Sequence, residues 1–179
     1  MNEELRSILI GTAGLSLAGV IALSLAVVRR PRPWNNASVR WTVRLAVVAV
    51  LLQAAHFIEE SATGFYQRFP ELLGLASWPR QFFVSFNLFW LGIWVLSISG
   101  LATRRRGALF PLWFLAVACF ANGVAHPLLS VRTGGYFPGL LTSPLVGVIG
   151  FLLLRRLLLI TEADSVPPRG RVDPDDGAL

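Results

Sequence analysis

The sequence predicts an all-α integral membrane bundle of about five transmembrane helices, with the N-terminus outside the cell and the C-terminus in the cytoplasm. Three observations predict this fold. Hydrophobic residues make up 54% of the 179 positions and charged residues only 15%, whereas soluble domains carry about 25% charged residues. Apolar stretches of membrane-crossing length recur along the chain. Arginine is concentrated in alternate connections between these stretches.

Five apolar stretches are expected to cross the bilayer, because each approaches the roughly 20 residues that a helix needs to span a core of about 30 Å. Helices are required, since backbone groups inside lipid find no water to bond. The expected helices cover about 8–28, 45–62, 82–101, 108–131 and 144–160. They form one transmembrane domain over 1–162, and the Pro-, Gly- and Asp-rich segment 163–179 is expected to be a flexible cytoplasmic tail.

The first of these stretches is expected to remain as a helix. The chain begins with acidic residues and lacks the basic start of a cleavable signal peptide. Gly14 and Ala18 are four residues apart, a spacing that favours close helix approach and suggests a homo-oligomer.

Arginine placement predicts the orientation. The chain has a net charge of +6, and its basic residues are all arginines beside apolar segments, so they indicate topology and lipid headgroup contacts rather than nucleic-acid binding. Twelve lie on the predicted cytoplasmic side, and four (Arg6, Arg68, Arg80 and Arg132) lie on the other. A multi-pass protein of the cytoplasmic (inner) membrane, in contact with membrane lipids, is therefore expected.

The second predicted helix carries polar residues that are unusual in lipid: Gln53, His56, Glu59 and Glu60. At about 100° per residue, all four point into one sector of the helix. A charge at the bilayer centre costs at least about 2.5–3.5 kcal/mol. The two carboxyl groups must therefore be protonated, paired, hydrated or bound to a cation.

Further polar groups are expected at a similar depth. Asn122 and His126 share one face of the fourth helix, and Asn87 lies near the outer start of the third helix, close to Trp90. The alternating topology places these residues with His56 in the outer half of the bilayer. The sequence therefore predicts one shared site.

Imidazole and carboxylate groups in a helical bundle are typical ligands of Zn²⁺ or iron. The predicted catalytic and metal-binding residues are His56, Glu59, Glu60 and His126. Gln53, Asn87, Trp90 and Asn122 are expected to bind substrate or position these groups. Together they predict an enzyme that acts on a lipophilic small molecule, either through a divalent metal or by direct acid–base catalysis.

Two other function classes remain open. The carboxyl groups could serve a small proton- or cation-coupled transporter, or the bundle could simply bind a lipophile. Alternatively, the polar groups are structural: Glu59 and Glu60 pair with arginines at the interface, His126 makes an interhelical hydrogen bond, and the protein binds a partner.

The segment His56-Phe57-Ile58-Glu59-Glu60 resembles the signature of the HXXEE-domain family of small bacterial membrane proteins, whose function is unassigned. The resemblance extends over roughly 43–160. It implies that His56, Glu59 and Glu60 belong to a shared site and implies no particular reaction.

Overall fold

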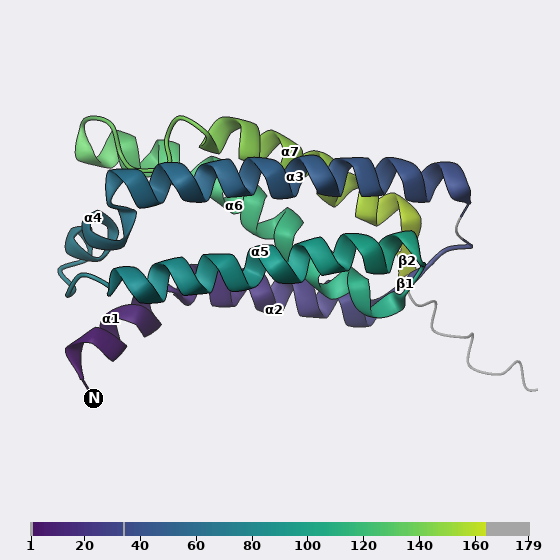
Figure 1. The fold of residues 1–179 in the computed structure, drawn as a ribbon, viewed down its shortest axis with the longest axis horizontal. Coiled ribbons are helices and arrows are strands. Elements are labelled where there is room, and N and C mark those ends of the chain that lie inside the picture. The colour runs from purple at the N-terminus through teal and green to yellow at the C-terminus, as the bar shows by residue number, and fades with distance from the viewer. Residues whose placement is uncertain (1, 34, 164–179) are drawn as a thin grey trace, which may run out of the picture.

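The computed structural model describes residues 2–33 and 35–163, and within them the fold is helical apart from one short ribbon (Figure 1). The tail predicted at 163–179 lies outside the described residues from position 164 onward. The elements in chain order are α1 (Glu3–Gly11), α2 (Ala13–Val28), β1 (Arg29–Pro31), α3 (Asn36–Thr63), α4 (Phe65–Leu72), α5 (Arg80–Ala102), the 3₁₀ turn η1 (Arg106–Ala108), α6 (Leu109–Thr133), α7 (Ser143–Ile160) and β2 (Thr161–Ala163).

The first predicted helix, 8–28, is two helices that meet at Thr12 and are bent by 46°. α1 begins earlier than expected because the side chain of Asn2 caps it, accepting a hydrogen bond from the backbone N–H of Glu4. The hydroxyl of Ser7 donates to the carbonyl of Ala76 over 2.5 Å and thereby holds α1 against the segment before α5. Such a long-range contact leaves no trace in the local hydropathy.

α3 is longer than the predicted helix 45–62, since it begins at Asn36. The Asn35 side chain caps it by accepting a hydrogen bond from Ser38 N over 2.7 Å. The polar first turns, with Arg40 and Arg44, are therefore helical although they are not apolar. The other three predicted helices differ from α5, α6 and α7 by at most two residues at either end.

Four helices, α3, α5, α6 with its preceding η1 turn, and α7, are each long and apolar enough to cross a membrane, and the bent pair α1–α2 passes the same test when taken together. Large apolar side chains face outward on them, such as Leu51, Leu96 and Leu128, which are 65%, 69% and 62% exposed. Such a surface suits lipid better than water.

α6 is the most enclosed helix of the bundle and packs extensively against α7 and α2. Its backbone meets that of α7 where Gly123 faces Gly147, so closely that a Cβ atom on either glycine would collide with the other's backbone. α3 lies against α7 and α5. This arrangement brings α3 and α6 together near the end of the bundle where α4 lies (Figure 1).

The two ends of the bundle differ in character. At one end lie α1, α4 and the loop 134–142 between α6 and α7 (Figure 1). At the other end β1 pairs with β2 in an antiparallel ribbon, and the guanidinium of Arg29 donates to the hydroxyl of Thr161 over 2.9 Å. The ribbon fastens the end of α2 to the end of α7.

Candidate metal centre

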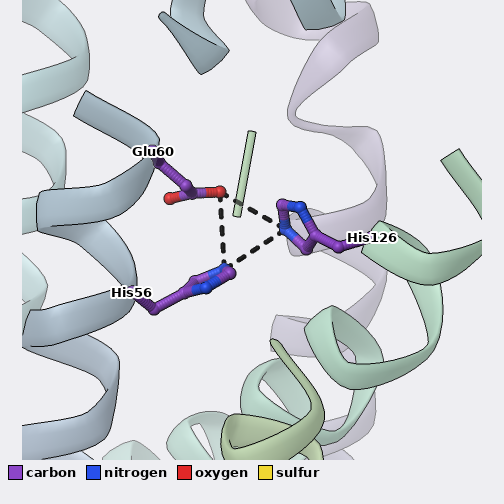
Figure 2. A group of neighbouring side chains, drawn as sticks. All are labelled: His56, Glu60 and His126. Atoms are coloured by element: carbon purple, nitrogen blue, oxygen red, sulfur yellow. Dashed lines mark hydrogen bonds and ion pairs between the residues drawn. The ribbon is translucent and has the colours of Figure 1, made fainter. Parts of the chain in front are cut away.

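Three polar side chains from α3 and α6 meet inside the bundle (Figure 2). His56 and Glu60 lie one turn apart on α3, and His126 faces them from α6. The Nε2 atoms of the two histidines are 3.2 Å apart, and Glu60 Oε1 lies 3.5 Å from His56 Nε2 and 3.4 Å from His126 Nε2. All three residues are buried, and we call them the His–Glu cluster.

The proton position on His126 follows from its second ring nitrogen. Nδ1 lies 2.6 Å from the carbonyl oxygen of Pro138. A carbonyl can only accept, so Nδ1 carries the hydrogen and donates it. In the neutral ring, Nε2 is then an unprotonated acceptor that faces the cluster.

The proton position on His56 follows from a longer chain of hydrogen bonds. The Thr142 hydroxyl donates to Glu59 Oε2 over 2.6 Å, so its oxygen is left to accept from His56 Nδ1, 2.7 Å away. The Nε2 atom of neutral His56 is therefore also an acceptor facing the cluster.

Three acceptor atoms thus converge with no donor among them. One proton placed between them could satisfy one pair at most and would leave the third acceptor buried and unpaired, which is costly. A divalent cation accepts all three electron pairs at once. The two nitrogens and one carboxylate oxygen could therefore hold a metal ion.

Glu59 occupies a different place from the one predicted for it as a ligand. Its Oε1 accepts hydrogen bonds from the Tyr136 hydroxyl and Leu141 N, over 2.7 and 2.9 Å. Its Oε2 accepts from the N–H and the hydroxyl of Thr142, over 2.9 and 2.6 Å. Burial and the bond to Glu59 raise the pKa of the Tyr136 phenol, so this hydroxyl remains a donor at neutral pH. Glu59 thereby holds the loop 134–142 against α3.

The loop itself supplies groups that the sequence did not single out. Phe137 is buried, and Gly139 has a left-handed φ of 88°. A Cβ atom at Gly139 would lie 2.5 Å from His126 Nδ1 and 2.8 Å from His56 Cε1. Only glycine fits this backbone position over both imidazoles. The glycines and prolines between positions 134 and 144 are typical of an irregular backbone, but nothing in their pattern points to the histidines.

The remaining predicted site residues lie around a cavity of about 220 Å³. Glu60 and His126 line it together with Gln53, Asn87, Trp90 and Asn122. Gln53 accepts from the Cys119 thiol over 3.4 Å, and the Asn87 amide donates to the Phe83 carbonyl over 2.9 Å. The structure therefore brings His56, Glu60 and His126 into contact and places the four further residues along a space that begins at the cluster.

Comparison with known proteins agrees with the motif. The model of a family described as "Protein of unknown function with HXXEE motif" matches residues 47–153. Searches of curated proteins and of solved structures give no match. The matched range includes α6 and most of α7, so it covers both halves of the His–Glu cluster as well as the loop between them. The chain therefore belongs to the HXXEE family.

Proposed function

We propose that this protein is a membrane-embedded zinc hydrolase that cleaves an ester or amide bond in a lipophilic molecule. The observation that carries the proposal is the convergence of His56 Nε2, His126 Nε2 and Glu60 Oε1, all acceptors, at the wall of an apolar cavity. Two histidines and one glutamate are the protein ligands of several zinc hydrolases. The direct acid–base alternative leaves one acceptor of the cluster without a partner.

The spacing of the cluster is compatible with zinc. Two ligands of a tetrahedral zinc, with bonds of about 2.0–2.2 Å, are about 3.3–3.5 Å apart. The three observed separations, 3.2, 3.4 and 3.5 Å, are close to these ligand spacings.

The chemistry follows from the open side of the cluster. Three protein ligands leave a fourth position for water or substrate, and bound zinc lowers the pKa of a bound water to about 7. Glu60 and His126 border the cavity whereas His56 is fully buried, so a zinc ion held by these residues would be reached from the cavity. The chain's own residues orient the ligands. The Pro138 carbonyl accepts a hydrogen bond from His126, and the Thr142 hydroxyl accepts one from His56. Glu59 in turn accepts a hydrogen bond from the Thr142 hydroxyl.

Hydrolysis of 4-nitrophenyl octanoate by the purified protein in detergent tests this function. We expect turnover that disappears with a zinc chelator, returns when Zn²⁺ is restored, and is lost in Glu60→Gln. Glu71→Gln is the matched control, because Glu71 is an exposed carboxylate on α4 and should leave turnover unchanged. Equal turnover in both variants, or turnover that survives chelation, would show that the cluster does not catalyse hydrolysis.

We further propose that the cluster lies in the half of the membrane nearer the cell exterior. The four arginines on the predicted outer side and the twelve on the predicted inner side support this orientation. The cluster belongs to the outer side because His56 and Glu60 lie near the end of α3 that leads into α4, and His126 lies near the end of α6 that leads into the loop 134–142. A fluorescent protein fused after Leu179 should then fluoresce in the cytoplasm, and an N-terminal epitope should bind antibody added to intact spheroplasts. A C-terminal fusion that does not fluoresce, together with an N-terminal epitope that the antibody cannot reach, would show the opposite orientation.

A further inference from the structure

The cavity beside the His–Glu cluster has a mostly aromatic wall with a few polar groups in it. Glu60 and His126 border it, as does Asn122, one helical turn before His126 on α6. The rest of the wall is formed chiefly by Phe82, Phe86, Trp90, Trp94 and Phe114. A molecule that fills this space needs a polar end and an apolar remainder.

One hydrogen-bond donor at the wall lacks an acceptor. No described residue forms a hydrogen bond with the side-chain amide of Asn122, although this amide borders an apolar space. Unpaired donors in such surroundings cost free energy, so the site is suited to an occupant that carries acceptor oxygens.

The α2 wall includes two small residues. Gly14 and Ala18, whose spacing favours close helix approach, line the cavity beside Leu15, and a Cβ atom at Gly14 would meet no atom within 4 Å. Gly14 is exposed at the surface, as are Ala121 and Ala125 on the opposite wall. The cavity therefore opens beside the bend between α1 and α2, on the apolar flank of the bundle.

The volume limits what can enter. At about 220 Å³ the cavity is smaller than the roughly 300–1,000 Å³ of sites that enclose a whole drug-sized ligand. It can hold a polar group and the first part of a slim chain, but not a multi-ring or multi-chain lipid. The remainder of a longer molecule must leave through the opening beside Gly14.

We propose that this cavity binds a single-chain acyl amphiphile, whose carbonyl end reaches the His–Glu cluster and whose chain passes Asn122 and leaves beside Gly14 into the surrounding lipid. The proposal rests on the proposed zinc site and adds the class of substrate and its route of entry. The aromatic wall of α5 packs against the chain, and Asn122 donates to an oxygen near its polar end.

Alkyl hydroxamates of increasing length test the proposal, because the hydroxamate group binds zinc and the alkyl chain would occupy the cavity. With the zinc-loaded protein in detergent, we expect affinity to rise from acetohydroxamate to octanohydroxamate by up to about fourfold for each methylene that enters the cavity. In Gly14→Leu the added side chain fills the opening, so acetohydroxamate should still bind while the gain with chain length is lost. Gly19→Leu is the matched control, because Gly19 is on the same helix, has open space for a Cβ atom and lies outside the cavity lining.

The outcomes separate the two proposals. If acetohydroxamate fails to bind the parent protein, the zinc site itself is wrong. If it binds, but the gain with chain length is equal in the parent, Gly14→Leu and Gly19→Leu, the zinc site stands and the cavity assignment is overturned. Ala121→Leu narrows the same opening from α6, and it should reproduce the loss even if Gly14→Leu does not fold.

Discussion

The purified protein should bind one equivalent of Zn²⁺, and replacing one ligand of the His–Glu cluster should weaken that binding by more than about 100-fold. The reason is that each ligand supplies a bond to the metal, whereas loss of a supporting hydrogen bond alone costs about 10–100-fold in metal affinity. Isothermal titration of the metal-free protein with Zn²⁺ measures the affinity. His126→Ala and Glu60→Gln test ligands from two different helices.

The same titration tests the hydrogen bond that orients His56. Thr142→Val keeps the side-chain shape but removes the acceptor for His56 Nδ1, so affinity should fall by about 10–100-fold. Thr103→Val is the matched control, because the Thr103 hydroxyl bonds only to carbonyls at the end of α5. A parent protein that binds no divalent cation, or ligand variants that bind as tightly as the Glu71→Gln control, would contradict the metal centre.

Gly139→Ala should cause the second large loss, although position 139 supplies no ligand. The new Cβ atom would lie 2.5 Å from the His126 ring and 2.8 Å from the His56 ring. A left-handed backbone also costs a non-glycine residue about 1–2 kcal/mol. Because the loop or the rings must move, we expect the Zn²⁺ affinity to fall at least as far as in Thr142→Val, together with a lower melting temperature.

Two neighbouring glycines separate collision from backbone strain. Gly134 also has a left-handed φ, 70°, but has open space around a Cβ atom, and Gly135 has open space without the unusual φ. Gly134→Ala should therefore lower the melting temperature with little change in Zn²⁺ affinity, and Gly135→Ala should change neither. If Gly134→Ala weakens Zn²⁺ binding as much as Gly139→Ala does, strain in the loop rather than contact with the imidazoles is responsible.

The sequence predicted the all-α fold and most helix positions because hydropathy reports the apolar length of a helix directly. It failed where other interactions decide. The break at Thr12 and the early start of α1 depend on a cap and on the contact between Ser7 and Ala76. The early start of α3 depends on the Asn35 cap, since its first turns are too polar to be recognised by apolarity.

For the candidate site, helical spacing was enough to place His56 and Glu60 on one face, and the alternating topology brought His126 to the same depth. Spacing could not decide between the two adjacent glutamates. Glu59 lies only about 100° from Glu60 around the helix. Its role follows from its hydrogen bonds to the loop 134–142, and helical spacing does not reveal these. The roles of Pro138, Gly139 and Thr142 depend on contacts far apart in sequence and were therefore not predictable.

The close approach of Gly123 and Gly147 sets the distance between α6 and α7. The loop 134–142 joins these two helices, so the same contact also sets the distance that the loop must bridge. That distance in turn affects where the Pro138 carbonyl and the Thr142 hydroxyl lie relative to the two imidazoles. These two oxygens determine which nitrogen of each imidazole is protonated. The tautomeric state of both histidines is thus governed by a pair of residues that have no side chains and touch neither ring.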